Sequence, residues 1–324
     1  MTQRSSLVGQ GILVTGGAGF IGSHLVDKLL AMGAREVVVI DNLFVGSEDN
    51  LVEAYKSGHV TFYRDDAEFQ TSLSYIFANH QIDTVFNCAT KALNYSFLNP
   101  ANAFSTNVTV TLNLLEFQRL GAFKTLCHFS TSEVYGSAVY EPMDEAHPKN
   151  PTTTYAAGKA AADHAVESYV RMFGVDAFIV RPFNNYGPRQ NYKGMLAGII
   201  PITAWRILKG ITPELHGDGL QSRDFIYVYD TVDAVTKLYS VLPAGESVNI
   251  STDNQISMRD LLGRICREMT YAGEIVNKPG RKSDVLCHNA SNEKVHRLID
   301  YSLTPFEVGL RETLDWYRQQ IGVQ

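Results

Sequence analysis

The sequence predicts an α/β protein in which a doubly wound parallel sheet is followed by a smaller α/β lobe. From residue 11 to about residue 180, short β-branched runs alternate with helical patterns. These runs are apolar at consecutive positions, as in strands buried on both faces between two layers of helices. After Arg181-Pro182 the rhythm changes, because Gly, Pro, Asn and Tyr become dense.

Six strands are expected, at 12–14, 37–40, 60–63, 84–86, 125–129 and 177–180. Beyond them the patterns indicate a loop at 184–194, a strand at 223–228, and helices at 199–209, 230–241 and 307–319. We therefore expect the chain to pass twice between two parts. Residues 1–181 with about 224–250 form the sheet domain, and about 182–223 with 251–324 form the lobe.

Composition restricts the classes of partner. The 324 residues are 45% hydrophobic and 19% charged, and this balance is typical of a globular protein. The net charge of −6 argues against nucleic acid, so a phosphate ligand would need a local basic patch. No apolar run approaches the roughly 18 residues of a membrane span, and the N-terminus lacks a signal-like apolar stretch. The four cysteines form no C-x-x-C pair, which favours free thiols, no metal site and a cytoplasmic location.

The strongest motif is the glycine loop Thr15-Gly-Gly-Ala-Gly-Phe-Ile-Gly22, between the first strand and a helical pattern. Its glycines permit a tight turn, a close approach to a pyrophosphate and close packing of the helix on the strand. The helix N-terminus then offers free N–H groups to the phosphates. The predicted dinucleotide contacts in this loop are Gly16, Gly19, Phe20, Ile21 and Gly22.

An acidic residue in the right place strengthens this prediction. Asp41 ends the second strand about 20 residues after the glycines, where a carboxylate binds the ribose hydroxyls and repels a 2′-phosphate. NAD is therefore expected rather than NADP, with Asn42 alongside. An Asp-Asn pair at a strand end is also common in turns, which is the alternative for Asp41. Asp66, after the third strand, is a candidate for the adenine edge or for a surface turn.

Tyr155 and Lys159 form the candidate catalytic pair, four residues apart at the start of an alanine-rich helical run. Residues at this spacing share one helix face. An ammonium beside a phenol favours the phenolate, so we expect Lys159 to lower the pKa of Tyr155 and make it a base. A Tyr–Lys pair alone is weak, since a surface helix explains many examples.

A hydroxyl and carboxylate cluster follows the strand at 125–129 and supports the same site. Ligands of a parallel sheet bind beyond the carboxyl ends of its strands, where Thr131, Ser132 and Glu133 fall. We expect Thr131 to hydrogen-bond the substrate oxygen that Tyr155 deprotonates, Glu133 to take a proton from carbon, and Ser132 to relay one. The competing interpretation is an ordinary helix cap, with Glu133 in a capping box.

Taken together and in order, TGGAGFIG, the strand-end Asp, STSEVYG, YAAGK, RPFNNYGPRQ and RDFIYVYD resemble the extended short-chain dehydrogenases/reductases. This family contains nucleotide-sugar epimerases, 4,6-dehydratases and decarboxylases, and the resemblance covers nearly the whole chain. It implies a modified Rossmann domain that holds NAD(H) and a lobe that binds a nucleotide-diphosphate sugar. It also implies a homodimer, in which helices near 101–118 and 155–173 form a four-helix interface. Hydride transfer from the sugar C4 is then the role of Tyr155 and Lys159, with Thr131 as the hydroxyl partner.

The resemblance leaves the reaction open. Thr131-Ser132-Glu133 looks like the triplet of GDP-mannose and UDP-N-acetylglucosamine 4,6-dehydratases, and 4,6-dehydration is the reaction we favour. The triplet also occurs in UDP-glucuronate decarboxylases, while many dTDP-glucose dehydratases have Asp where this chain has Ser132. A 4-dehydrogenase and a 4-epimerase stay open, as does a decarboxylase, although Cys287-His288 stands near the place of its carboxylate-binding Arg. A non-catalytic NAD sensor and a reductase of small carbonyl compounds are the alternatives of other kinds.

Four residues are candidates for substrate contacts. Asn184 matches the family's amide contact to the substrate diphosphate, and Arg223 and Arg281 are natural phosphate partners because a guanidinium binds two phosphate oxygens at once. Surface salt bridges are the alternative for both arginines. Lys91 lies in a stretch, 88–95, that departs from the patterns of the well-known branches, and we expect it to touch the sugar.

Overall fold

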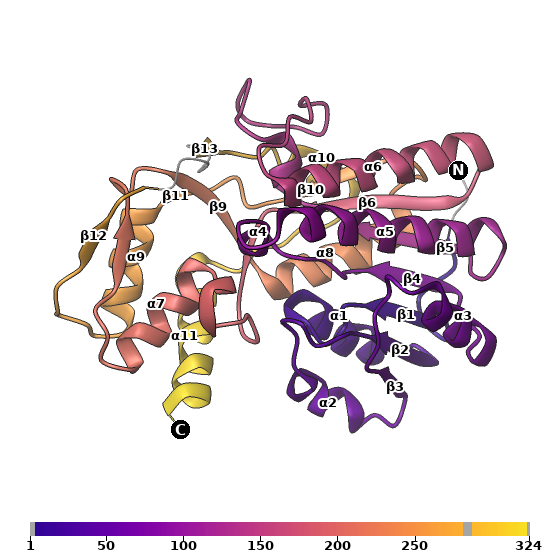
Figure 1. The fold of residues 1–324 in the computed structure, drawn as a ribbon, viewed down its shortest axis with the longest axis horizontal. Helices are drawn as coiled ribbons and strands as arrows, with labels where there is room; N and C mark the ends of the chain where they lie inside the picture. Colours follow the sequence, from indigo (N-terminus) through magenta and orange to yellow (C-terminus); the bar gives the residue numbers. More distant parts are fainter. Residues whose placement is uncertain (1–3, 281–286, 323–324) are drawn as a thin grey trace.

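A computed structural model describes residues 4–280 and 287–322, and its centre is a parallel sheet of seven strands (Figure 1). The strands are β1 (Gly11–Thr15), β2 (Glu36–Ile40), β3 (Val60–Tyr63), β4 (Thr84–Asn87), β5 (Thr125–Phe129), β6 (Asp176–Pro182) and β10 (Ser247–Ile250). Their order is β10-β6-β5-β4-β1-β2-β3. Because the order reverses direction at β1, the sheet is doubly wound and the α/β prediction is confirmed.

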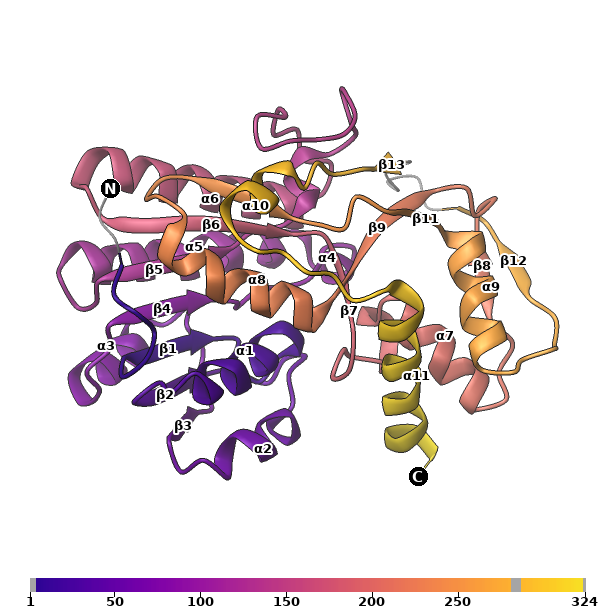
Figure 2. The same ribbon diagram turned by 180° about the vertical axis from the view of Figure 1, so that it is seen from behind.

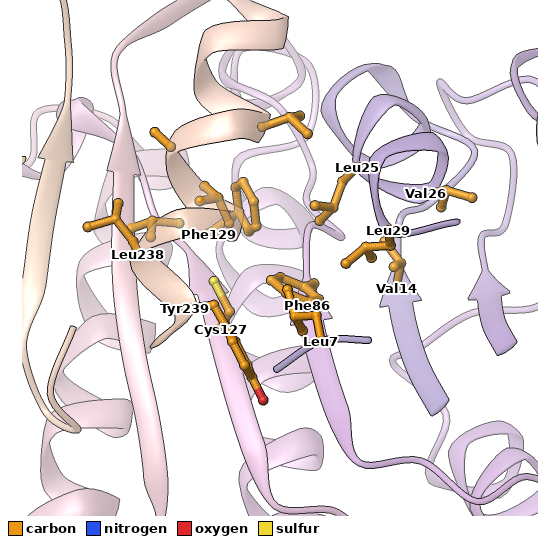
Figure 3. Packing of buried hydrophobic residues seen from close by; sticks show 14 of the residues in the cluster. Leu7, Val14, Leu25, Val26, Leu29, Phe86, Cys127, Phe129, Leu238 and Tyr239 are labelled. Atoms are coloured by element: carbon orange, nitrogen blue, oxygen red, sulfur yellow. The ribbon is translucent and has the colours of Figure 1, made fainter. Parts of the chain in front are cut away.

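Side-chain alternation along the strands builds a core on each face of the sheet. Ile12 and Val14 of β1 join the core under α1 (Phe20–Ala31) and α8 (Val228–Val241), as Figure 3 shows for Val14 and its neighbours. Leu13 points the other way, into the core under α3 (Gln70–Asn79), α5 (Pro100–Arg119) and α6 (Thr154–Phe173). Period-two alternation with both faces apolar is what a sheet sandwiched between helices requires.

All six expected strands are present, within two residues of their predicted ends. The seventh, β10, pairs with β6 in parallel at the sheet edge. The expected loop at 184–194 is only partly a loop. Its first residues form the short strand β7 (Asn184–Tyr186), which pairs with β9 (Ser222–Tyr227). Two of its three residues are Asn, which is depleted in strands, so the local sequence disfavours a strand here.

The lobe has its own sheet and its own core. β9 pairs with β7, with β11 (Gln255–Ser257) and with β13 (Cys287–His288), while β8 (Glu214–His216) and β12 (Val276–Lys278) form a separate pair. The helices of the lobe are α7 (Ile199–Leu208), α9 (Met258–Glu268) and α11 (Phe306–Gly322), as Figure 2 shows from behind. Their apolar faces meet in one cluster.

The chain crosses between the two parts more often than the proposed division has it. Residues 224–227 were assigned to the sheet domain, yet they belong to β9 and pair with lobe strands. Residues 293–301 were assigned to the lobe, yet Val295 of α10 (Glu293–Leu298) and Tyr301 pack into the core of the large sheet. We therefore retain the two-part division as a proposal, with its crossings at these segments. None of the helices in the described ranges is long and apolar enough to cross a membrane.

Candidate functional site

The glycine loop forms a tight cradle between β1 and α1. Gly16 has φ +67°, and a Cβ there would lie 2.8 Å from the backbone nitrogen of Ala89, at the end of β4. A Cβ on Gly22 would lie 2.2 Å from the carbonyl oxygen of Gly16. No side chain caps the N-terminus of α1, and its first turn contains no acidic residue. The first N–H groups are thus available to an anion, so the cradle fits a pyrophosphate.

Asp41 links this loop to the end of β2. Its Oδ2 accepts a hydrogen bond from the Ala18 amide at 3.0 Å and its Oδ1 accepts one from the Leu43 amide at 2.8 Å. Burial raises the pKa of Asp41, and these amides oppose the shift. The turn interpretation is therefore confirmed, and Asp41 also lines the cavity that reaches the glycine loop, where its predicted contact with the ribose stays a prediction. A carboxylate has about four lone-pair sites, so two amides leave capacity for ribose hydroxyls.

A cavity of about 300 Å³ joins the cofactor loop to the catalytic pair. Its lining includes every residue predicted to contact the cofactor, together with Lys91: Gly16, Gly19, Phe20, Ile21, Gly22, Asp41, Asn42, Asp66, Lys91, Tyr155 and Lys159. Asn42 donates to Asp66 Oδ2 at 2.6 Å, which orients both side chains at the rim. One continuous site therefore connects the carboxyl ends of β1 and β2 with the start of α6.

Lys159 is anchored under the sheet edge. Its Nζ donates to the carbonyl oxygen of Phe129, the last residue of β5, at 2.8 Å, and the residue is 2% exposed. Burial lowers the pKa of Lys159 to about 8, and the charge of Asp163 opposes this shift. At neutral pH the ammonium form prevails. It lies one helical turn from Tyr155, on the same face of α6.

The pKa of Tyr155 is shifted upward, whereas a downward shift was expected. Burial raises it to about 12, hydrogen bonding with Thr131 and Thr90 lowers it, and the charge of Glu133 raises it. The expected lowering of the Tyr155 pKa by Lys159 was wrong. The Lys159 ammonium donates to the Phe129 carbonyl, and burial of the phenol has the largest effect on the Tyr155 pKa. Desolvation of a phenolate is costly unless a cation lies beside it.

The cluster after β5 combines a cap with a site. Thr131 caps the short 3₁₀ helix η2 (Ser132–Tyr135) and accepts a hydrogen bond from the Glu133 amide at 3.2 Å. A helix cap is thus present at Thr131, but Glu133 follows it by two residues rather than the three that a capping box requires. Thr131 also reaches the Tyr155 hydroxyl, and the Glu133 carboxylate lies close enough for its charge to act on that phenol. Ser132 is 3% exposed, so its hydroxyl is enclosed.

The predicted lobe contacts lie away from the cavity lining. Asn184 is the register partner of Phe225 on β9, and its Nδ2 donates to the Asp224 carbonyl at 3.1 Å. Arg223, two residues before Phe225, donates to the Ser222 carbonyl at 2.9 Å. These two residues thus share the lobe sheet, and neither lines the 300 Å³ cavity. Arg281 lies outside the described residues.

Several lining residues were not identified from the sequence. Gln190 and Asn191 enter the cavity from the loop after β7, and Ser130 enters at the end of β5. Thr90, at the end of β4, lines the cavity and hydrogen-bonds Tyr155. The density of Asn and Gln in the loop after β7 indicated one of these segments, and the rule that ligands bind beyond the carboxyl ends of parallel strands indicated the others. Neither observation identified these particular side chains.

Lys91 has an aromatic environment. Its Nζ lies 3.6 Å from the centroid of the Phe44 ring and 5.8 Å from that of Tyr95, and the residue is 8% exposed. A cation over two aromatic rings is held electrostatically without a hydrogen-bond acceptor. Its three N–H donors can thus bind an anion or a hydroxyl within the cavity.

Comparison with known proteins identifies the family. The family model described as "NAD dependent epimerase/dehydratase family" matches residues 12–251. A putative UDP-glucose 4-epimerase of Methanocaldococcus jannaschii is 33% identical over 309 residues, which are 95% of this chain and 98% of that protein.

Two solved structures agree over almost their whole length. A Thermotoga maritima UDP-glucose 4-epimerase with UDP-glucose is 33% identical with a TM-score of 0.90, covering 96% of this chain and 99% of that one. A Streptomyces venezuelae dTDP-glucose 4,6-dehydratase with NAD is 30% identical with a TM-score of 0.91, covering 97% and 98%. The resemblance and the NAD cofactor are thereby confirmed, and the chain belongs to the NAD dependent epimerase/dehydratase family.

Proposed function

We propose that this protein oxidises C4 of a nucleotide-diphosphate sugar with NAD⁺, and that it acts as a nucleotide-sugar 4,6-dehydratase. One observation carries the proposal. The Tyr155 phenol hydrogen-bonds with Thr131, and the charge of the Glu133 carboxylate acts on it. Tyr155 lines the cavity that begins at the glycine loop. A base for O–H and a base for C–H at one place suit oxidation followed by elimination.

The first step is removal of hydrogen from C4. Tyr155 takes the proton of the C4 hydroxyl while the C4 hydride leaves, and Thr131 holds the oxygen that carries the charge. When bound in the cavity lined by the glycine loop, Tyr155 and Lys159, NAD⁺ would supply the hydride acceptor and a positive charge. That charge would favour the phenolate, which burial alone disfavours. The Lys159 ammonium adds to the same effect.

Elimination uses the next two residues of the chain. A C4 ketone acidifies the C5 proton, which Glu133 takes. The C6 hydroxyl leaves as water with a proton passed through Ser132, the hydride returns to C6, and a proton returns to C5. The balance is the loss of one water molecule. Ser132 is a weaker acid than a carboxylic acid, so Glu133 supplies the proton that the serine relays.

The substrate is placed by the residues predicted for it. Lys91 reaches the sugar from the cavity wall, and Asn184 and Arg223 bind the diphosphate from the lobe sheet. Arg281, outside the described residues, stays a predicted phosphate contact. Local cationic groups are required for this, because the overall charge of −6 gives an anion no general attraction.

A 4-epimerase is the second candidate. One reason is the buried Ser132 hydroxyl, because a dehydratase would benefit from a stronger acid at this position to protonate the leaving hydroxyl. The other is the similarity to the M. jannaschii and T. maritima proteins. A 4-dehydrogenase would stop at the ketone and release NADH. A UDP-glucuronate decarboxylase and a non-catalytic NAD sensor are further alternatives that the same experiment separates.

The test is mass spectrometry of products from a panel of UDP-, GDP- and dTDP-sugars, with NAD-loaded enzyme in D₂O. The dehydratase predicts a 4-keto-6-deoxy sugar with deuterium at C5. A 4-keto sugar with C6 intact would identify a dehydrogenase, and a C4-inverted product without solvent deuterium an epimerase. Loss of CO₂ would identify the decarboxylase. NAD bound without any product would favour the sensor.

Two substitutions divide the reaction. Glu133→Gln should still oxidise C4, and so accumulate NADH and a 4-keto sugar, but should lose elimination by a factor of ~10² or more. Tyr155→Phe should block the oxidation itself. Glu141→Gln, an exposed carboxylate in the next loop, is the control and should keep wild-type turnover. Elimination at the wild-type rate in Glu133→Gln would refute the role of Glu133.

The homodimer and the cytoplasmic location implied for the chain stay predictions. The support for a dimer is the α5–α6 pair, which presents the exposed apolar residues Phe104, Leu112 and Met172.

A further inference from the structure

Asp163 is a buried carboxylate behind the catalytic helix. It lies on α6 one turn after Lys159 and is 0% exposed. The Arg181 guanidinium, itself 1% exposed, donates to Asp163 Oδ2 from Nε at 3.1 Å and from Nη2 at 3.0 Å. Hydrogen bonds from a guanidinium to a carboxylate are charge-assisted and stronger than those between neutral groups.

The charge of Lys159 depends on nearby anions. Its Nζ donates to the neutral carbonyl of Phe129, and burial lowers the pKa of Lys159 to about 8. Two charges oppose that shift, those of Asp163 and of the Cys88 thiolate. Burial raises the pKa of Cys88 far above its ordinary value, so at neutral pH Cys88 is an uncharged thiol. Asp163 is then the anion that supports the ammonium.

The second oxygen of Asp163 faces a chain of polar side chains under the sheet. Asp163 Oδ1 lies 3.7 Å from His128 Nε2, and neither atom has a hydrogen-bond partner among the described residues. Asn87 accepts from Thr15 on Oδ1 at 2.7 Å, so its amide NH₂ points to His128 Nδ1 at 3.2 Å. His128 therefore carries its proton on Nε2, toward Asp163.

Burial and the surrounding cations keep His128 neutral. Burial lowers its pKa well below the ordinary value, and the charges of Lys159, Arg181 and Lys149 act in the same direction. Lys149 Nζ lies 3.9 Å from Asp163 Oδ2 and 2.5 Å from Glu167 Oε1, so its charge is shared with a second carboxylate. Asp163 is thus surrounded by cations and by one neutral imidazole.

We propose that Asp163 is a positioning residue for the oxidation step. Its carboxylate keeps the Lys159 ammonium charged inside the buried site, and the two hydrogen bonds from Arg181 hold that carboxylate in place. The role of Lys159 in the reaction rests on the proposed function, whereas the effect of Asp163 on its charge does not.

The test separates these two dependences. In NAD-loaded protein labelled with ¹³C at lysine Cε, the Lys159 signal is assigned by its loss in Lys159→Arg and is titrated by NMR without any nucleotide sugar. Asp163→Asn should lower the pKa of Lys159 by at least about one unit, a tenfold fall in the charged-to-neutral ratio at fixed pH. Asp315→Asn, the same substitution at an exposed carboxylate of α11 that pairs with Arg318, is the matched control and should leave the titration unchanged.

The sign for activity follows from the same shift. A lysine required as ammonium loses its effect as the pH rises through its folded pKa. The alkaline limb of kcat should therefore move to lower pH in Asp163→Asn by the same amount as the NMR titration, with little change in KM. If this variant does not fold, the neutral pair Asp163→Asn/Arg181→Gln removes the uncompensated guanidinium and should show a smaller shift in the same direction, because loss of the Arg181 charge favours the ammonium.

Either of two results would overturn the proposal: an unchanged Lys159 titration, or a loss of activity that is equal at every pH. Absence of product in the wild type would refute only the proposed function, since the NMR shift needs no substrate.

Discussion

At the scale of single residues, Asp41 performs two functions with one carboxylate. It holds the glycine loop through the Ala18 amide and the following turn through the Leu43 amide. A Cβ on Gly46 would lie 3.1 Å from its Oδ2, so the chain passes close over the carboxylate. A 2′-phosphate placed here would bring negative charge against a partly desolvated anion. We therefore expect cofactor preference to depend on a group that also shapes its own loop.

This leads to a prediction about cofactor choice. The purified protein should bind NAD at least about 100-fold more tightly than NADP, measured by fluorescence titration, because a desolvated charge repulsion exceeds a few kcal/mol. Asp41→Asn should reduce the preference for NAD over NADP. The Asn side chain carries no charge, but its oxygen can still accept a hydrogen bond from one of the two backbone N–H groups, of Ala18 or Leu43. Asp41→Ala should weaken NAD and also lower the melting temperature. Equal affinity for both cofactors in the wild type would contradict this assignment.

How far the site could be predicted depends on whether its residues are neighbours in sequence. Gly16 to Gly22, and Tyr155 with Lys159, are set by spacings that one helix or turn dictates. Thr90 and Gln190 reach the same cavity from separate segments, and only the folded chain brings them together. The sign of the Tyr155 pKa was missed for a related reason, since spacing reveals a neighbouring lysine but does not reveal burial.

At the scale of elements, the close approach of α5 and α6 depends on one small residue. A Cβ on Gly158, within the Tyr155–Lys159 turn, would lie 2.8 Å from the Phe104 carbonyl and 3.3 Å from the Asn107 Cβ. Asn107 in turn accepts from Thr90 at 2.9 Å and from the Lys91 amide at 3.2 Å. The glycine thus sets the distance between the catalytic helix and the loop that carries Thr90.

Substitution of this glycine should therefore affect both stability and the site. Gly158→Val should lower the free energy of unfolding by ~1–3 kcal/mol, as overpacking does, and should weaken NAD binding because α6 must shift. Chemical denaturation and NAD titration measure the two effects. His164→Ala, with its side chain 63% exposed on the same helix, should change neither. Wild-type stability in Gly158→Val would show that α5 can move without cost.

Among the elements, strands of the large sheet were predictable because each repeats apolar residues and ends at turn residues. β7 was not, because its stability comes from pairing with β9 rather than from its own residues. The placement of residues 224–227 with the sheet domain has the same cause, because β9 pairs with β7 and β11. The run Arg223–Val228 reads as a strand, but its sequence does not say which sheet it joins.

At the scale of the whole molecule, the helices α5 and α6 carry an exposed apolar surface. Phe104, Val108 and Leu112 repeat every four residues along α5, and Phe104 and Leu112 are 40% and 37% exposed. α6 packs beside α5 and ends with the exposed Met172 and Phe173. Apolar residues at this spacing form a stripe along one helix face, and such a stripe in contact with water suits an interface.

A two-fold interface through this stripe would bring α5 and α6 of one copy against α5 and α6 of its partner. We predict a dimer in analytical ultracentrifugation at micromolar concentration. Leu112→Glu should give a monomer, because two like charges would be buried across the two-fold axis. Leu220→Glu, at a lobe position that is 69% exposed, is the control and should leave the dimer intact. NAD content should be the same in both variants, since Leu112 and Leu220 lie outside the cavity lining. A monomeric wild type, or a dimeric Leu112→Glu protein, would place any assembly on another surface.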